Sequence, residues 1–595
     1  MLPLAVEPFG GYRAWLETLP GYAGQIAFHR VLPARPPGLA PYEGAFKPVL
    51  ARLGLAPYAH QAEAFERLEA GAHVVMATPT ASGKSLVFQA PVLAAMRQGG
   101  TALFLYPTKA LARDQKSRLE TLADPFDLSD RIFTYDGDTP PARRRKARET
   151  ALAILTNPDM LHFGVLPRHS AWAGFLARLR YVVIDEAHYH RGVFGSHVAL
   201  ILQRLLRLAE RYGANPQLIA ASATIANPAA HAAALTGRPF EAIRASGRFS
   251  ELEFVVWPPK ALDASGERRR SANLEAAELA VWAATHDLKT LVFTGSRKTA
   301  ELIGRYTRGT AVEDKIRSYR AGYTAEERAR LEEAFRAGEL TVLVSTSALE
   351  LGIDIGGLDA VVMVGYPGSV NAFWQRAGRA GRGRERALAL WIPREDPLDA
   401  YFSERPERLL GSPPESAVAD WKNPYLYPPH LHCAAFEHPV DPAEPIYLGE
   451  LADDPHLQEH GGRIYTTFKN PHRRISLRGG GVTFTLRDAS GKALGQLDER
   501  QAYWEAHPGA VYLHQGESYL VRNLDPKKRE VVLLPSLEDH YTQPRATTEI
   551  EVYPEHAVEV QPGVWVGRVR MREQVTGYVK KRYVTEAVLE EVEQP

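Results

Sequence analysis

Two short stretches of the sequence combine side chains that suit phosphate chemistry. They are Thr78-Pro79-Thr80-Ala81-Ser82-Gly83-Lys84-Ser85 and Asp185-Glu186-Ala187-His188. In the first, backbone N–H groups of small residues can converge on phosphate oxygens, while Lys84 reaches the outer phosphates and the Ser85 hydroxyl binds Mg²⁺. In the second, Asp185 can hold the metal ion and Glu186 can polarise a water molecule. Together they predict a site that hydrolyses a nucleoside triphosphate.

Further residues around these stretches are expected to contact the nucleotide. Thr78 replaces the first glycine of the usual GxxxxGK[ST] pattern. Gln61 lies ahead of the loop, where its amide can pair with adenine, and Tyr58 can stack on the ring. His188 is interpreted as a nucleotide-site group and not as a metal ligand. The expected nucleotide contacts are Tyr58, Gln61, Thr78, Thr80, Ser82, Gly83, Lys84, Ser85 and His188.

Short apolar runs alternate with longer helical segments around both stretches. The runs that we expect to be strands cover residues 73–76, 102–106, 151–155, 181–184 and 218–221. Strands of this kind, separated by helices, indicate a parallel sheet that is buried on both faces. Each run ends in a polar cluster, and the carboxyl ends of parallel strands share one edge of the sheet. The sequence therefore predicts an α/β domain with its ligands along that edge.

A second α/β series has expected strands at residues 290–293, 341–344 and 360–364. It has no phosphate loop, but it contains Gln375-Arg376-Ala377-Gly378-Arg379-Ala380-Gly381-Arg382. Arginines separated by glycines can reach a phosphate from a tight turn. A solvated basic loop would not need glycines at such regular positions. We therefore expect this series to supply an arginine finger to the nucleotide.

Changes in composition divide the 595 residues into six parts. We expect a lead-in that drapes over the first domain at 1–50, the first α/β domain at 51–246, a linker at 247–275 and the second α/β domain at 276–402. Proline-broken short helices occupy 403–444, and alternating apolar residues predict a β-rich domain at 445–595. Basic runs beside tyrosines in this last part fit either a single-strand platform or solvated hairpin tips.

Charge and cysteine content limit the classes of function. The formal net charge of +1 gives no global attraction to nucleic acid, so any such site must be a local patch. The single cysteine, Cys433, excludes a disulfide framework and a four-cysteine zinc site within this chain. The neighbouring histidines at 430, 432 and 438 fit no standard zinc spacing, and a buried helix face is the preferred interpretation. No basic leader or membrane-length apolar run is present, so we expect a cytoplasmic monomer without membrane contact.

Over roughly residues 50 to 400, these motifs resemble those of superfamily-2 helicases of the DEAH-box form, in order and spacing. The stretches 188–197, 319–323 and 423–437 are similar to the subgroup that contains mitomycin repair factor A and fungal RecQ-like helicases. The resemblance implies two tandem RecA-like domains, a winged-helix-like module and ATP-driven 3′-to-5′ DNA unwinding in cross-link repair. It also implies that Gly352 and Asp354 couple the second domain to the nucleotide, and that Gln375, Arg379 and Arg382 complete the site. Arg382 is the preferred finger to the γ-phosphate.

The resemblance ends near residues 577–581, after which relatives usually carry a four-cysteine zinc domain. Activities that depend on that module are therefore open. Along the strand edges, we expect nucleic-acid backbone contacts from Thr108, Lys109, Thr156, Arg320, Ser345 and Thr346. The expected partners are single-stranded and tailed duplex DNA, with ATP and Mg²⁺ as cofactors. An RNA helicase, a remodelling ATPase that does not separate strands and a non-hydrolysing DNA-binding module remain as alternatives.

Overall fold

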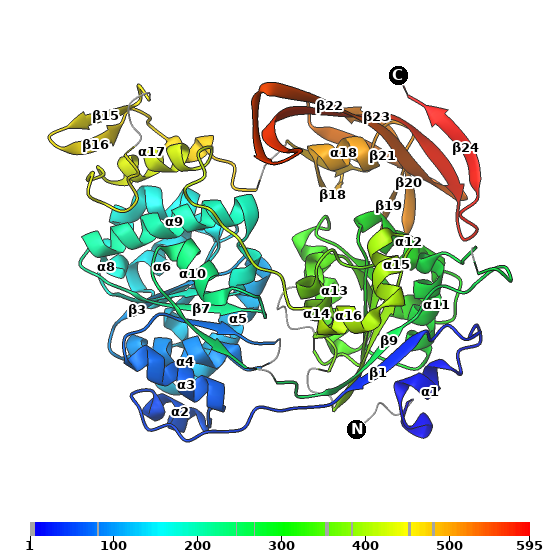
Figure 1. Ribbon diagram of the computed structural model, residues 1–595, viewed down its shortest axis with the longest axis horizontal. Helices are drawn as coiled ribbons and strands as arrows, with labels where there is room; N and C mark the ends of the chain where they lie inside the picture. The colour runs from blue at the N-terminus through cyan, green and yellow to red at the C-terminus, as the bar shows by residue number, and fades with distance from the viewer. Residues whose placement is uncertain are drawn as a thin grey trace.

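The computed structural model describes residues 6–79, 82–245, 247–266, 268–350, 356–381, 385–449, 454–478 and 482–594. The described chain forms two α/β domains that lie side by side, and each carries an accessory module on its upper side (Figure 1). The predicted fold class, two parallel-sheet RecA-like domains followed by a winged-helix module and a β-rich region, is confirmed.

The first α/β domain is built on a seven-stranded parallel sheet with the order β4-β5-β3-β6-β7-β2-β8. The strands are β2 Val74–Ala77, β3 Thr101–Leu105, β4 Ile132–Tyr135, β5 Ala153–Thr156, β6 Leu179–Ile184, β7 Gln217–Ser222 and β8 Glu241–Arg244. The helices are α2 Lys47–Leu53, α3 Ala59–Glu69, α4 Lys84–Arg97, α5 Lys109–Ala123, α6 Pro141–Thr150, α7 Pro158–Met160, α8 Ala173–Leu176, α9 Gly192–Arg211 and α10 Pro228–Thr236. Successive strand residues face opposite sides of the sheet, so Val182 and Ile184 enter the core that includes α9, whereas Val183 enters the core that includes α4.

The second α/β domain has a seven-stranded sheet with the order β1-β9-β14-β13-β10-β12-β11. Its strands are β1 Phe28–Leu32, β9 Glu251–Val256, β10 Thr290–Phe293, β11 Ile316–Tyr319, β12 Val342–Ser345, β13 Ala360–Val364 and β14 Arg386–Ile392. Its helices are α1 Tyr12–Leu16, α11 Ala272–Thr285, α12 Arg297–Tyr306, α13 Ala325–Ala337, α14 Val370–Ala377, α15 Pro397–Glu404 and α16 Pro406–Gly411. All neighbouring strands are parallel except β1 and β9.

The N-terminal segment packs on the second domain, so the expectation that it drapes over the first domain is wrong for its first part. Strand β1 pairs with β9 in antiparallel register, and the Trp15 ring stacks on Trp282 of α11 with centroids 5.9 Å apart. Buried Glu253 of β9 accepts hydrogen bonds from the Tyr12 and Arg13 N–H groups. Strand β9 offers an open edge and an apolar flank, and the lead-in covers both.

The predicted linker at 247–275 also differs from the structure, because it contains β9 and the start of α11. Its prolines and arginines lie in the turn that follows β9, which is why the composition of this stretch hides a core strand. The described chain that joins the two α/β domains is shorter. Arg35 and Arg248 form an antiparallel bridge there, with reciprocal backbone hydrogen bonds of 2.7 and 3.0 Å. Two segments of the chain thus connect the domains.

The winged-helix region lies on the first domain. It contains α17 Tyr427–Glu437 and a hairpin of β15 Leu457–His460 and β16 Arg463–Thr466. Cys433, Ile475 and Leu477 belong to the same buried cluster as α9. Helix α16, which the sequence placed with this module, packs through Leu409 into the core of the second domain. Among the described residues that enter these two cores, those of the winged-helix region pack on the first domain alone.

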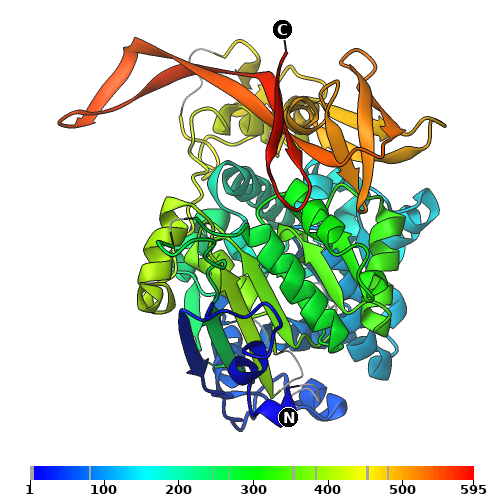
Figure 2. The same cartoon turned by 90° about the vertical axis from the view of Figure 1, so that its right-hand side faces the viewer.

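The β-rich region lies above the second domain and has two sheets. The first has the order β18-β17-β21-β20-β19, with β17 Thr483–Arg487, β18 Ala493–Asp498, α18 Glu499–Glu505, β19 Val511–His514, β20 Glu517–Asp525 and β21 Glu530–Pro535. The second consists of β22 His540–Gln561, β23 Val564–Arg582 and β24 Val588–Glu593. The long β22–β23 hairpin projects away from the body of the molecule (Figure 2).

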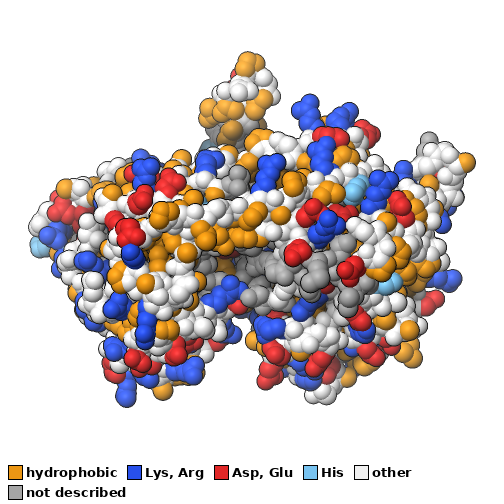
Figure 3. All heavy atoms as spheres, turned by 90° about the horizontal axis from the view of Figure 1, so that it is seen from below, with side chains coloured by type: hydrophobic (Ala, Val, Ile, Leu, Met, Phe, Trp, Pro, Cys, Tyr) orange, Lys and Arg blue, Asp and Glu red, His pale blue; other side chains and the backbone are white. Residues whose placement is uncertain are grey.

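Seen from below, a notch separates the two halves of the molecule, and Lys and Arg side chains flank it on both sides (Figure 3). Among the described helices, none has the length and apolar character needed to cross a bilayer.

Candidate nucleotide site and nucleic-acid interface

The phosphate loop connects β2 to α4 at the carboxyl edge of the first sheet. Gly83 precedes the helix with φ of +80°, and a Cβ atom there would lie 2.6 Å from Gln61 Nε2, so glycine is required. The Lys84 ammonium donates to the carbonyls of Thr78 and Ser222 at 3.2 and 3.1 Å. These carbonyls hold the ammonium at the helix N-terminus, where the backbone favours an anion.

The acidic pair follows β6, as predicted. Burial, and then the charge of Glu186, raises the pKa of Asp185 to about 7. A bound cation would reverse this shift, because it favours the ionised carboxylate. Glu186 has φ of +51°, which is costly for a residue with a side chain and is typical of functional sites. The strand end therefore holds two close carboxylates in a conformation that suits metal and water binding.

The adenine side of the site contains Tyr58 and Gln61 at the start of α3. Gln61 is buried, its Oε1 accepts from the Tyr58 N–H at 2.8 Å, and its Nε2 donates to the Gly83 carbonyl at 2.8 Å. One amide proton and one lone pair remain for a base. The Thr78 and Ser82 hydroxyls lie 2.5 Å apart and stabilise the loop from within. The structure thus brings the predicted Gln61 into direct contact with the phosphate loop.

His188 joins the two domains at the site. Its Nδ1 accepts from the Ala223 N–H at 3.0 Å, and its Nε2 contacts the Gln375 amide of α14. Burial is the largest cause that lowers the pKa of His188 to about 4, so the ring is neutral near pH 7. With Nδ1 as an acceptor, the neutral ring carries its proton on Nε2. A hydrogen bond to α14 then requires the Gln375 amide turned so that its oxygen faces the ring, whereas its nitrogen faces the ring in the structure.

The arginine-bearing turn follows α14 in the second domain. Arg379 is 2% exposed and its Nε donates to the Glu350 carbonyl at 3.1 Å, while Arg376 forms an ion pair with the Glu350 carboxylate at 2.9 Å. Glu350 therefore positions two arginines of the predicted finger motif, a role that the sequence did not indicate. The expected residues Thr80, Gly352, Asp354 and Arg382 lie outside the described residues.

The six expected nucleic-acid contacts fall into two groups, three that are partly exposed and three that are buried. Thr108 caps α5 through a hydrogen bond from the Leu111 N–H at 3.3 Å, and half-exposed Lys109 forms an ion pair with Asp138 at 2.9 Å. Thr346 is partly exposed. These three groups lie at the strand edge where a backbone could pass.

Three of the expected contacts are buried in the structure, which corrects their assignment. Thr156 donates to the Tyr135 carbonyl at 2.6 Å, and Ser345 donates to the Thr346 carbonyl at 3.1 Å. Arg320 is 1% exposed and points into the β-rich module. Position after a strand suggested these residues, but Thr156 and Ser345 are held by carbonyls of their own domains, and the β-rich module covers Arg320.

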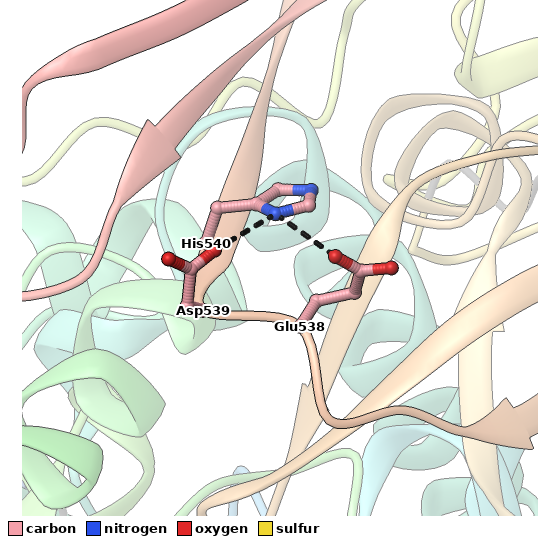
Figure 4. Close-up of side chains that lie close together, drawn as sticks. All are labelled: Glu538, Asp539 and His540. Carbon is pink, nitrogen blue, oxygen red and sulfur yellow. Dashed lines mark ion pairs between the residues drawn. The ribbon is translucent and has the colours of Figure 1, made fainter.

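Two clusters of side chains carry donor atoms that could hold a metal ion. In the first, burial raises the pKa of the Cys433 thiol to about 12, and His432 bonds Thr466 and Asp454 at 2.8 and 2.9 Å. Within the described chain, one group brings three potential ligand atoms within 4.8 Å, namely Glu538, Asp539 and His540 (Figure 4). Its members are consecutive, and the His540 ring is paired with both carboxylates. Neither cluster indicates a metal centre.

Comparison with known proteins gives three family matches in chain order. They are the DEAD/DEAH box helicase family at residues 58–232, the helicase conserved C-terminal domain at 274–384 and the winged helix domain of ATP-dependent helicase HRQ1 at 419–480. The uncharacterized ATP-dependent helicase YprA of Bacillus subtilis is 39% identical over 515 residues, which cover 83% of this chain and 69% of YprA. The chain is a DEAD/DEAH-box helicase of the Hrq1/MrfA type.

Other relatives of this helicase agree with that placement. ATP-dependent helicase HRQ1 of Saccharomyces cerevisiae is 33% identical over 525 residues, but this chain spans 49% of its length. The crystal structure of the DUF1998 helicase MrfA bound to DNA matches with a TM-score of 0.89 and 34% identity, over 98% of this chain and 82% of that one. With DNA and AMPPNP bound, MrfA matches with a TM-score of 0.87 and 34% identity, over 98% and 83%. The helicase therefore belongs to a family of nucleic-acid-dependent ATPases.

Proposed function

We propose that this helicase hydrolyses ATP in a DNA-dependent reaction, moves 3′-to-5′ along single-stranded DNA and unwinds tailed duplexes in DNA repair. The observation that supports it best is the contact between His188 and Gln375, which links the acidic strand end of one domain to α14 of the other. A nucleotide bound there would draw the domains together and release them after hydrolysis. A strand laid across both domains would then be gripped alternately through its phosphates.

The roles of the individual groups follow from their positions. Asp185 and Ser85 would hold Mg²⁺, which would neutralise charge on the nucleotide phosphates. The raised pKa of buried Asp185 fits this role, because that carboxylate needs a cation to remain ionised. Glu186 orients the attacking water, and Lys84 exchanges its two carbonyl acceptors for phosphate oxygens. Arg379 and Arg382 stabilise the charge that develops on the γ-phosphate.

The 3′-to-5′ direction of movement and the tailed duplex substrate are proposed from the resemblance to MrfA and Hrq1. Unwinding of tailed duplexes tests both directly. Duplexes with either a 3′ or a 5′ single-stranded tail are incubated with ATP, using the wild type and Lys84→Ala. We expect strand separation of the 3′-tailed duplex by the wild type alone. Separation of the 5′-tailed duplex, or equal unwinding by Lys84→Ala, contradicts the proposal.

ATPase assays discriminate the other candidate functions. Stimulation by RNA and not by DNA indicates an RNA helicase, while DNA stimulation without strand separation indicates a remodelling ATPase. A non-hydrolysing DNA-binding module would be indifferent to Glu186→Gln. We expect Glu186→Gln to lower turnover at least a hundredfold, because removing one well-placed catalytic group costs about that much.

A further inference from the structure

Three consecutive residues between β8 and β9 contact both sides of the nucleotide site. The guanidinium of Arg248 lies over the ring of Trp374, 5.7 Å from its centroid, next to Gln375 on α14. The Phe249 ring contacts Tyr58 of the first domain, with centroids 5.5 Å apart and planes tilted by 58°. The Ser250 hydroxyl donates to the Gly381 carbonyl in the arginine-bearing turn.

This segment, residues 248–250, is firmly held from behind. The backbone of Arg248 is bridged to Arg35 of the second connecting strand, and Ser250 is buried. Gly381 has φ of +86°, and a Cβ atom there would lie 2.5 Å from Ser250 Oγ, so the close approach requires glycine. The position of Phe249 is therefore fixed by contacts on either side of it in sequence.

Phe249 keeps an open surface between half-buried Arg248 and buried Ser250. It is 39% exposed, so part of its ring is open to a ligand. Tyr58 is already in contact with two rings, since His60 stacks on it with centroids 5.8 Å apart and planes within 13°. Phe249 is thus the aromatic group that offers free area beside the predicted adenine position.

The position lies within reach of a base whose phosphates occupy the loop. A Cβ atom on Gly83 would lie 3.6 Å from Tyr58 Cε2, so the Tyr58 ring borders the phosphate loop, and Phe249 borders Tyr58. Gln61, whose amide retains one donor and one acceptor, lies against the same glycine. An adenine that pairs with Gln61 would therefore extend toward Phe249.

We propose that Phe249 stacks on the adenine base of bound ATP. Phe249 then contacts the base from the chain segment that connects the domains. Because residues 248–250 also contact α14 and the arginine-bearing turn, binding of the base affects the position of these two elements. Aromatic stacking is tolerant of base identity, whereas the Gln61 amide supplies the preference for adenine. The inference rests on the proposed ATP site at Lys84, and it adds a residue that no nucleotide motif contains.

The test uses the full chain and the variants Phe249→Ala, Phe249→Trp and Phe9→Ala. Phe9 is a matched control, because it is a phenylalanine with 42% exposure in the N-terminal segment. We expect Phe249→Ala to raise the KM for ATP about tenfold with kcat within twofold, since loss of one stacked base costs about that much. Phe249→Trp should restore the KM, and Phe9→Ala should match the wild type.

Two further readouts separate base recognition from a structural effect. Inorganic tripolyphosphate has no base, so its competition against a fluorescent ATP analogue should be equal for wild type and Phe249→Ala. In Phe249→Trp, ATP should change the fluorescence of the new tryptophan, whereas tripolyphosphate should not. An unchanged KM in Phe249→Ala, or equal weakening of tripolyphosphate, overturns the inference. If the wild type binds ATP but DNA does not stimulate its ATP hydrolysis, the proposed function is wrong. The tripolyphosphate competition then still tests whether Phe249 binds the base.

Discussion

The two accessory modules are attached to their α/β domains by buried Arg–Glu pairs that are arranged differently. Arg204 of α9 and Glu437 of α17 are each fully buried, and this ion pair crosses the interface between the first domain and the winged-helix region. Arg320 and Glu301 are equally buried, but both belong to the second domain. There the interface is crossed by hydrogen bonds, from Arg320 to the Tyr512 hydroxyl at 2.8 Å and from the Gly516 N–H to Glu301 at 2.9 Å.

The groups around the two pairs also differ. Arg204 donates to Nδ1 of His162 and of His430, each at 3.1 Å, and His472 bonds Glu437 at 2.9 Å. Around Arg320, the neighbours are the Tyr512 and Tyr323 hydroxyls and one histidine, His514, whose Nδ1 lies 3.3 Å from the guanidinium. The Tyr323 hydroxyl lies 2.6 Å from Glu301. One module thus depends on a charge supplied across the interface and on three neutral histidines. The other depends mainly on neutral phenols, with a single histidine beside them. In both cases each module should move with its own α/β domain when the nucleotide cleft opens and closes.

The largest effect is expected from Glu437→Ala. Removing this carboxylate leaves Arg204 buried without a counter-charge, which typically costs about 3–5 kcal/mol. We expect that loss in the free energy of unfolding and faster hydrogen exchange in α17 peptides. Glu459→Ala, at an exposed position of β15, serves as the control and should change neither. A loss below about 1 kcal/mol would show that the ion pair does not anchor the winged-helix region.

A smaller effect is expected from Glu301→Gln on the other side. The amide keeps the size of the side chain, and its single oxygen can still accept from Arg320 and Tyr323, while its nitrogen faces the Gly516 N–H. Arg320 loses its counter-charge but retains its neutral partners. A hydrogen bond to a charged group contributes about 1.5–3 kcal/mol, and we expect a loss near 2 kcal/mol with faster exchange in β19 and β20. Glu326→Gln, exposed on α13, is the matched control. If Glu301→Gln destabilises more than Glu437→Ala, the proposed difference between the two interfaces is wrong.

Acid should weaken the attachment of the winged-helix region more than that of the β-rich module. Burial is the largest cause that lowers the pKa of His162 to about 2, and it also lowers the pKa of His430 and His472. Because the unfolded rings bind protons below about pH 6.5, stability is lost as pH falls through that value, by at most about 1.4 kcal/mol per pH unit for each ring. We expect hydrogen exchange in α17, corrected for intrinsic pH dependence, to rise more between pH 7 and 5 than exchange in β20, because burial lowers the pKa of three histidines around Arg204 but of one, His514, beside Arg320.

Alkali should weaken the second interface more than the first, because two buried phenols lie around Arg320, whereas beside Arg204 burial raises the pKa of the Cys433 thiol. Burial is the largest cause that raises the pKa of Tyr323 and Tyr512 above its ordinary value near 10. The folded state therefore holds protons that the unfolded chain releases, and stability around Arg320 is lost as pH rises above about 10. If hydrogen exchange in α17 and in β20 responds equally to acid and to alkali, the proposed difference between the two interfaces is wrong.

The smallest effect is expected from Glu517→Gln, which breaks the ion pair with Arg308 at the edge of the second interface. The side chains are 37% and 60% exposed, and the pair is 2.7 Å long. Exposed pairs of this kind contribute about 0.2–1 kcal/mol. Thermal unfolding of Glu517→Gln should therefore resemble that of the wild type. A loss above 2 kcal/mol would show that the rim, and not the buried Arg–Glu pair, holds the β-rich module.

The nucleotide side of the first domain could be predicted from sequence because its signals are local. The loop before Lys84 and the carboxylates after β6 are contiguous stretches, and their strands were found within a few residues of the observed bounds. The interface residues could not be predicted in this way. Arg204 and Glu437 are 233 positions apart, and each is an ordinary helical residue until the fold brings them together.

Arg320 shows the opposite error. Its position after a strand end suggested a phosphate contact, because a strand end in an isolated α/β domain is open to solvent. The β-rich module covers that edge, and burial of the guanidinium became evident only in the structure. Phe249 could not be identified for a related reason, since a single aromatic residue in a short irregular stretch has no periodic signal.

The pairing of β1 with β9 means that the first α/β domain is inserted within the second. His29 and Glu253, which meet across this pair, are 224 residues apart. During synthesis at about 5–20 residues per second, the first strand leaves the ribosome roughly 10–45 s before its partner exists. The backbone groups of β1 must therefore remain without their partner strand while an entire domain is synthesised and folds. A recombinant second domain that begins after residue 250 would lack an edge strand of its own sheet.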